Sequence, residues 1–141
     1  MTTGGRRRGV AGTGGLNMYR VRIEDGFCAT HQVRLPDGSV EALHGHDWRV
    51  SVECAAPALD ACGMVVDFQE LQRVLRGLLS GLEHRRLNDL ACFAGRFPTA
   101  EVVAEWILSG VRSAGVRSAV RVEVTEAPGC RASYECPLGG A

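Results

Sequence analysis

Two stretches near the start of the chain alternate apolar and polar residues with a period of two, and they constrain the fold more than any other feature. They span Tyr19–His31 and His44–Cys54. Because successive side chains of a β-strand point to opposite faces, a slip of one residue would turn every apolar side chain toward water. The sequence Leu35-Pro36-Asp37-Gly38 between them is typical of a turn, so the two stretches predict a β-hairpin.

Three of the chain's four histidines lie on the apolar face of this hairpin. In the first stretch, His31 shares that face with Phe27 and Ala29, and with Ile23 if Asp25-Gly26 keeps the register. In the second stretch the same face carries His44, His46, Trp48, Val50 and Val52.

The histidines of this face predict a metal site. His44 and His46 are two residues apart, so their rings point to one side with backbones about 7 Å apart, and His31 on the facing strand supplies a third nitrogen. Three protein ligands with one open position are typical of a catalytic zinc, whereas a structural zinc usually has four. The alternative is three core or surface histidines without a metal.

Helical periodicity follows the hairpin. Asp67 and Glu70 have the spacing of a capping box, and apolar residues recur at helical spacing from there to Leu82. A second amphipathic helix is predicted after Pro98, where the Thr99 hydroxyl can cap its first turn.

Two further strands are predicted near the C-terminus. Val120, Val122 and Val124 alternate with polar residues, and a short segment, Ala132–Tyr134, can pair with them after the Pro128-Gly129 turn. The order strand, strand, helix, helix, strand, strand favours an α+β fold, with a four-stranded antiparallel sheet and both helices on one face.

Composition excludes several classes of partner. Sixteen basic and sixteen acidic residues give no net charge, so no overall field favours nucleic acid or a membrane surface. No apolar stretch approaches the roughly 20 residues needed to span a bilayer, and we expect a cytoplasmic protein whose six scattered cysteines are free thiols. Residues 1–17, rich in glycine and arginine, are predicted to be a disordered tail before one domain over 18–138.

Two acidic positions are candidates for chemistry. Glu126 shares the parity of Val124, which directs its carboxylate along the apolar face, where an unpaired charge is costly. A slip of register or an exposed strand end is the alternative. Glu83 precedes His84 after the first helix, and such a pair can tune a proton carrier near neutral pH or be an ordinary surface pair.

Several motifs together resemble the 6-pyruvoyltetrahydropterin synthase and 6-carboxytetrahydropterin synthase family in order and spacing. They are Phe27–His31, Leu43–His46, Gly63–Phe68, Leu82–His84 with Leu87-Asn88, Pro98–Glu101, and Glu126 with Tyr134. The resemblance covers Tyr19 to about Cys136. It implies a tunnelling fold (T-fold), whose subunits join into barrels as a homohexamer of two trimers, with sites between subunits and a pterin as the small-molecule substrate.

The resemblance also implies roles for individual residues. His31, His44 and His46 would hold Zn²⁺, which orients and polarises the side-chain oxygens of 7,8-dihydroneopterin triphosphate. Glu126 would bind the amino-pyrimidine edge of the pterin, with Thr99 and Glu101 as further substrate-binding residues. His84 matches the proton-relay histidine of the family, and Glu83 stands where relatives usually have aspartate.

The chain departs from the family at the general base. Many bacterial relatives have a cysteine four residues before the first histidine of the His-Gly-His triplet, and here that position is Val40. Glu41 resembles the glutamate of a variant branch associated with cleaving the side chain to 6-hydroxymethyl-dihydropterin. It reaches the site only if the backbone before His44 leaves strand geometry, and otherwise it is a solvated hairpin residue. Cys28 has the opposite parity to His31 and is expected to face away.

Taken with the resemblance, these residues imply a zinc-dependent lyase acting on a dihydropterin, with Glu41 as the base and with Glu83 and His84 as the proton relay. Two alternatives stay open. One is a binding protein that kept the zinc and pterin pocket but lost turnover with its cysteine. The other is an enzyme that uses the same fold on another pterin-like or purine-like ring.

Overall fold

A computed structural model describes residues 17–139 and confirms the α+β arrangement predicted from the sequence. Residues 1–16, nearly all of the predicted tail, lie outside the described residues. Two short 3₁₀ turns, Leu87–Asp89 and Ala91–Phe93, separate the helices. In chain order the main elements are β1 (Tyr19–His31), β2 (His44–Ala56), α1 (Phe68–Ser80), α2 (Ala100–Ser113), β3 (Ala119–Ala127) and β4 (Cys130–Glu135).

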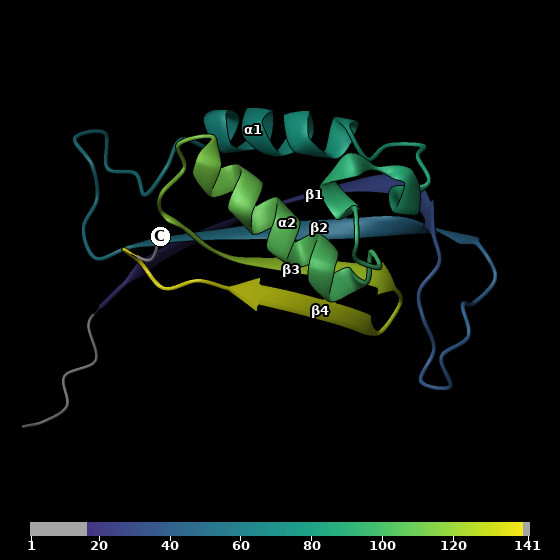
Figure 1. Ribbon diagram of the computed structural model, residues 1–141. Helices are drawn as coiled ribbons and strands as arrows, with labels where there is room; N and C mark the ends of the chain where they lie inside the picture. Colours follow the sequence, from purple (N-terminus) through teal and green to yellow (C-terminus); the bar gives the residue numbers. More distant parts are fainter. Residues whose placement is uncertain (1–16, 140–141) are drawn as a thin grey trace, which may run out of the picture.

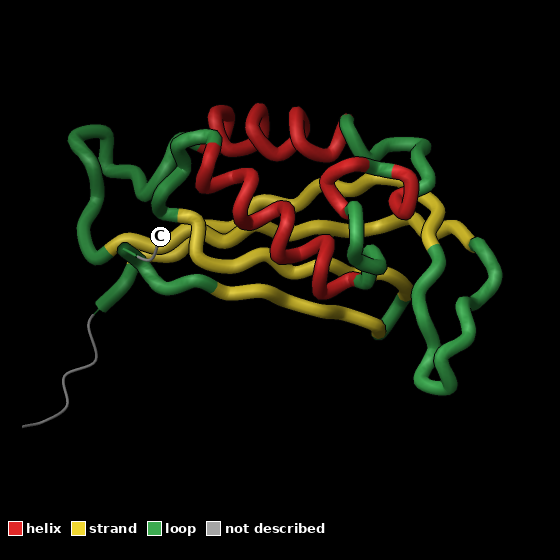
Figure 2. The backbone as a smooth tube through the Cα atoms, viewed as in Figure 1, coloured by secondary structure: helices red, strands yellow, loops and turns green. Residues whose placement is uncertain are grey.

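The four strands form one antiparallel sheet in the order β1-β2-β3-β4. Both helices lie across the same face of this sheet, and the opposite face carries none of the described helices (Figure 1). The connection between β1 and β2 extends beyond one end of the sheet (Figure 2). β2 and β4 are each longer than predicted, because β2 continues to Ala56 opposite Tyr19 and β4 pairs with β3 on both sides of the expected segment.

Pairing between β1 and β2 runs without a shift along its whole length, so the alternation of the sequence continues through Asp25-Gly26. His31 lies opposite His44, and Phe27 lies opposite Trp48, with no shift at Asp25-Gly26. Trp48 is fully buried, and its indole N–H donates a hydrogen bond to the carbonyl of Ala29 at 3.2 Å. The inward side chains of the two strands therefore form one continuous apolar surface for the helices.

The helices cover this surface with their apolar faces. Their buried apolar residues are Leu71, Val74, Leu75 and Leu79 in α1, and Val103, Ala104, Ile107, Leu108 and Val111 in α2. The two helices approach closely at Gly110, where a Cβ atom would lie 2.8 Å from Cδ2 of Leu78. All six cysteines are free, as expected. No helix within residues 17–139 is long and apolar enough to cross a membrane.

Side chains cap both helices, but the capping box predicted for α1 is only half formed. Thr99 caps α2 by accepting from the backbone N–H of Val102 at 3.3 Å. Asp67 caps α1 by accepting from the N–H of Gln69 at 2.9 Å. Glu70 does not reach back to Asp67, because its carboxylate pairs with the guanidinium of Arg73.

We therefore expect the two acidic residues of α1 to differ in their effect on stability. Asp67→Ala should lower the free energy of unfolding by about 1 kcal/mol, because it removes a helix cap. Glu70→Gln should cost less than about 0.5 kcal/mol, because it weakens only an exposed ion pair. Urea denaturation measures both values, and equal losses would mean that the full capping box forms in solution.

Candidate active site

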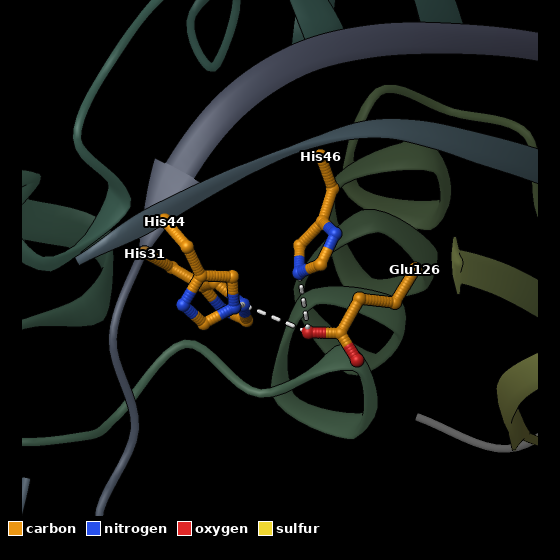
Figure 3. A group of neighbouring side chains, drawn as sticks. All are labelled: His31, His44, His46 and Glu126. Carbon is orange, nitrogen blue, oxygen red and sulfur yellow. Dashed lines mark hydrogen bonds and ion pairs between the residues drawn. The ribbon is translucent and has the colours of Figure 1, made fainter. Parts of the chain in front are cut away.

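Four potential ligands converge at one end of the sheet, on the face that the helices cover. His31 ends β1, His44 and His46 lie at the start of β2, and Glu126 is the penultimate residue of β3. Their ligating atoms lie within 4.8 Å of one another. Figure 3 shows the three rings and the carboxylate pointing toward a common centre. The structure thus brings together the three histidines that the sequence predicted as a metal site.

Backbone carbonyls orient two of the three rings. Nδ1 of His31 lies 2.8 Å from the carbonyl oxygen of Pro98, and Nδ1 of His44 lies 2.8 Å from that of Ala42. A carbonyl only accepts hydrogen bonds, so in each neutral ring Nδ1 carries the proton and Nε2 keeps its lone pair. The two Nε2 atoms are 3.1 Å apart, which brings their lone pairs to the same point.

His46 supplies the third nitrogen. Its Nε2 atom is buried and has no hydrogen-bond partner within residues 17–139, because Oε1 of Glu126, 3.2 Å away, lies outside hydrogen-bond geometry. Burial lowers the pKa of His46, as do the rings of His31 and His44, and Glu126 opposes this shift. In the neutral ring with its proton on Nδ1, Nε2 presents an unsatisfied lone pair, which is costly to bury and which a metal ion would satisfy.

Glu126 meets the histidines from the third strand. Its Oε1 atom lies 2.7 Å from Nε2 of His31, whose side chain is 1% exposed. The parity of Glu126 directs its carboxylate along the apolar face, where an unpaired charge is costly. The histidine cluster is the partner of this carboxylate. Acceptor atoms approach one another so closely only around a cation or a shared proton. The Glu126 side chain is 29% exposed, so a ligand can also reach it from solvent.

Trp48 forms the floor of the site. Its ring makes edge contacts with His31 and His46, at centroid distances of 4.8 and 5.5 Å, and it stacks on Phe27. Sequence reasoning assigned Trp48 to the core but gave it no part in the site. It also missed the carbonyls of Pro98 and Ala42, because a backbone acceptor leaves no signal in residue type.

The residues predicted to bind substrate surround one hollow of about 290 Å³. Thr99, Glu101 and Glu126 all line it. Thr99 reaches it from the N-cap of α2, and its hydroxyl already accepts the capping hydrogen bond. Glu101 follows in the first turn of the same helix and is exposed.

Glu41 lies beside the site because the backbone before His44 leaves strand geometry. Its Oε1 atom accepts from the N–H of Val33 at 3.1 Å and lies 3.7 Å from Nδ1 of His44. Val40, at the position where relatives have cysteine, is exposed. Cys28 is exposed as well, and its strand parity places it on the face opposite His31, as expected.

Glu83 and His84 stand apart from the histidine cluster. Nε2 of His84 lies 3.2 Å from Oε1 of Glu83, and the His84 side chain is 78% exposed. Glu83 lines a hollow of about 960 Å³ together with His46 and Glu126. Among residues 17–139, His84 is the only residue other than glycine with a positive φ, 56°. Backbone strain of this kind is concentrated at functional sites.

The chain is similar in sequence to several known proteins. A family model described as 6-pyruvoyl tetrahydropterin synthase matches residues 20–137. The chain is 35% identical over 125 residues to a 6-carboxy-5,6,7,8-tetrahydropterin synthase of Synechocystis sp., covering 85% of this chain and 95% of that protein. It is 33% identical over 93 residues to a dihydroneopterin monophosphate aldolase of Pyrococcus furiosus, covering 66% and 75%.

A solved structure shares the fold. The Caenorhabditis elegans 6-pyruvoyl tetrahydropterin synthase matches with a TM-score of 0.75 at 22% identity, covering 86% of this chain and 98% of that one. The shared fold carries the strand ends on which the histidine cluster is built, and the family model spans every residue of that cluster. This chain belongs to the 6-pyruvoyl tetrahydropterin synthase family.

Proposed function

We propose that this protein is a zinc-dependent pterin lyase that acts on 7,8-dihydroneopterin triphosphate or a closely related dihydropterin. The observation that carries the proposal is the convergence of three imidazole Nε2 atoms, one of them buried without a hydrogen-bond partner within residues 17–139. Membership of the family supplies the substrate class, because the relatives described above are enzymes of dihydropterin and tetrahydropterin chemistry.

The donor set fits zinc. Imidazole nitrogens bound to tetrahedral zinc at 2.0–2.1 Å lie about 3.3 Å apart, close to the 3.1 Å between Nε2 of His31 and Nε2 of His44. The carbonyls of Pro98 and Ala42 hold these two rings as metal-binding histidines are usually held, through the N–H of the other nitrogen. When bound, zinc supplies a Lewis acid that polarises an oxygen of the substrate side chain.

We assign Glu126 to the pterin ring and not to a fourth metal position. The amino-pyrimidine edge of a pterin presents adjacent N–H donors, which match the two oxygens of a carboxylate. Glu126 shares its hollow with Thr99 and Glu101, so a ring bound there has further polar groups beside it. A fourth protein ligand would close the position that a substrate oxygen must take.

Glu41 is our candidate for the base that takes a proton from the substrate side chain. Its carboxylate, 3.7 Å from the His44 ring, lies next to the zinc ligands, and Val40 has no group that accepts a proton. A glutamate in this role, together with the similarity to the Pyrococcus aldolase, favours cleavage of the side chain to 6-hydroxymethyl-dihydropterin over the other family reactions.

Glu83 and His84 are assigned to the proton relay of a neighbouring subunit. Neither residue contacts the three histidines within the described chain, and the His84 ring points into solvent. β1 and β4 are the edges of the sheet, and pairing with edges of other copies would cover them. We therefore propose a homohexamer in which the relay residues of one copy complete the site of another.

The second candidate function is a pterin-binding protein without turnover. The observation that favours it is Val40, which replaces the cysteine base of many relatives. The two functions differ in what Glu41 does, because a binding protein has no need of a base.

The metal assignment predicts that purified protein carries about one zinc per chain and that His46→Ala loses most of it. Glu126→Gln should keep its zinc while binding pterin at least tenfold more weakly, because one acceptor becomes a donor that faces another donor. Elemental analysis and calorimetry give the two quantities. If Glu126→Gln loses its zinc as His46→Ala does, then Glu126 is a fourth metal ligand.

The base assignment predicts that Glu41→Gln lowers turnover by roughly 100-fold while zinc content and pterin affinity stay nearly unchanged. Val40→Cys in that background should restore part of the activity, since it returns a base to the position used by relatives. Single-turnover kinetics with 7,8-dihydroneopterin triphosphate measures the effect. Native turnover by Glu41→Gln would show that another group removes the proton.

A further inference from the structure

The sheet face opposite the helices carries a row of residues that the chemistry above leaves unused. Gly26, Arg49, Thr125 and Arg131 are successive partners across the four strands, so they lie side by side. Arg49 and Thr125 have the opposite parity to His46 and Glu126, so the row projects away from the helices. Arg49, Thr125 and Arg131 line a hollow of about 570 Å³ on this face, together with Gly26.

Gly26 keeps one end of the row open. A Cβ atom at this position would lie 2.8 Å from the carbonyl oxygen of Trp48 and 3.7 Å from Cδ of Arg49. Gly26 therefore places no side chain beside Arg49 at the β1 end of the row, and Arg49 is exposed.

The positive charges of Arg49 and Arg131 are not balanced by a bound acidic side chain within residues 17–139. Within residues 17–139 neither makes an ion pair or a side-chain hydrogen bond. The acidic residues of the same hollow already have partners: Glu24 lies 3.8 Å from Arg22, Asp25 lies 3.0 Å from Arg76, and Glu123 lies 3.0 Å from Arg121. The hollow therefore offers two free guanidinium groups and few free carboxylates.

The spacing of these two arginines suits an oxyanion. Neighbouring strands lie about 4.8 Å apart, so the backbones of Arg49 and Arg131 are separated by about 10 Å, with Thr125 between them. Both side chains are long enough to lean over Thr125 and meet one phosphate group or a short chain of them. Guanidinium groups bind phosphate through two parallel N–H donors, and the Thr125 hydroxyl adds an O–H donor between them.

A split in the sheet connects this row to the histidine cluster. The pairing of β2 with β3 ends at Arg49 and Thr125, although β2 starts earlier, at His44, and β3 continues to Ala127. In that region the hollow of about 960 Å³ is lined by His46 and Glu126 from the helix side and by Arg49 and Thr125 from the other side.

Arg131 approaches the same place from the edge strand. It lines the smaller hollow that contains Glu126 and Thr99, as well as the hollow of the arginine row. Each of the two arginines therefore borders a hollow that also contains Glu126, one on either side of Thr125.

We propose that Arg49 and Arg131 form an oxyanion subsite that binds the phosphate groups of the substrate. The proposal rests on the proposed function, in which the pterin ring lies at Glu126 and the side-chain oxygens lie at the histidines. The phosphates then extend past the end of the β2–β3 ladder to the opposite face of the sheet. This subsite selects phosphorylated dihydropterins over their dephosphorylated forms.

The first test measures anion binding without any pterin. Inorganic triphosphate is titrated into the zinc-loaded, full-length protein at low salt by calorimetry. Arg49→Gln and Arg131→Gln should each weaken binding about tenfold, which corresponds to the loss of one charge-assisted contact. Arg22→Gln is the matched control, because Arg22 lines the same hollow but pairs with Glu24, and it should change the affinity less than about twofold.

The second test measures selectivity. The ratio of kcat/KM for 7,8-dihydroneopterin triphosphate to that for 7,8-dihydroneopterin should fall about tenfold in each arginine variant and stay constant in Arg22→Gln. The subsite is wrong if the unmodified protein does not bind triphosphate, or if the double variant Arg49→Gln, Arg131→Gln binds it as tightly. A further outcome is that both arginine variants lose triphosphate binding while the unmodified protein turns over no pterin. That result would uphold the subsite and contradict the proposed function.

Discussion

The cross-strand register of β1 and β2 is the constraint on which the site depends. It sets His31 opposite His44 and puts His46 on the same face. Trp48 holds this register, since its fully buried ring stacks on Phe27 and its N–H bonds to the carbonyl of Ala29. A slip of one residue would expose Trp48 and move the histidines of one strand to the other face, at a cost of several kcal/mol. The folding energy of the sheet therefore holds the candidate metal ligands in place.

Segments outside the sheet also position the side chains of the site. The carbonyl of Pro98, just before α2, and that of Ala42, just before β2, orient two histidine rings. The α2 N-terminus also brings Thr99 to the hollow beside Glu126. The segment at the start of α2 therefore supports both the proposed metal site and the proposed ring site. The end of the β2–β3 ladder adds a route from this site to the opposite face.

Strand parity made the residues of the histidine cluster predictable from the sequence. A period of two assigns each residue to one face of the sheet, and this needs no knowledge of the partner strands. His31, His44, His46 and Glu126 were found in this way. The arginine row was not, because Arg49, Thr125 and Arg131 become neighbours only through the pairing of β2, β3 and β4, which no local pattern specifies. The bend that brings Glu41 beside His44 and the left-handed backbone of His84 also depend on tertiary contacts. Glu70 does not complete the predicted capping box because its carboxylate pairs with the guanidinium of Arg73.

We propose that histidine-bound zinc is required for a reaction of this protein on a dihydropterin. The most direct test of this proposal is mass spectrometry of the products formed from 7,8-dihydroneopterin triphosphate by zinc-loaded protein and by the same protein after chelation. We expect a dihydropterin product with a cleaved or dephosphorylated side chain from the zinc-loaded protein, loss of that product on chelation, and its return when zinc is added back. Unaltered substrate in the presence of stoichiometric zinc, or equal product after zinc removal, would contradict the proposal.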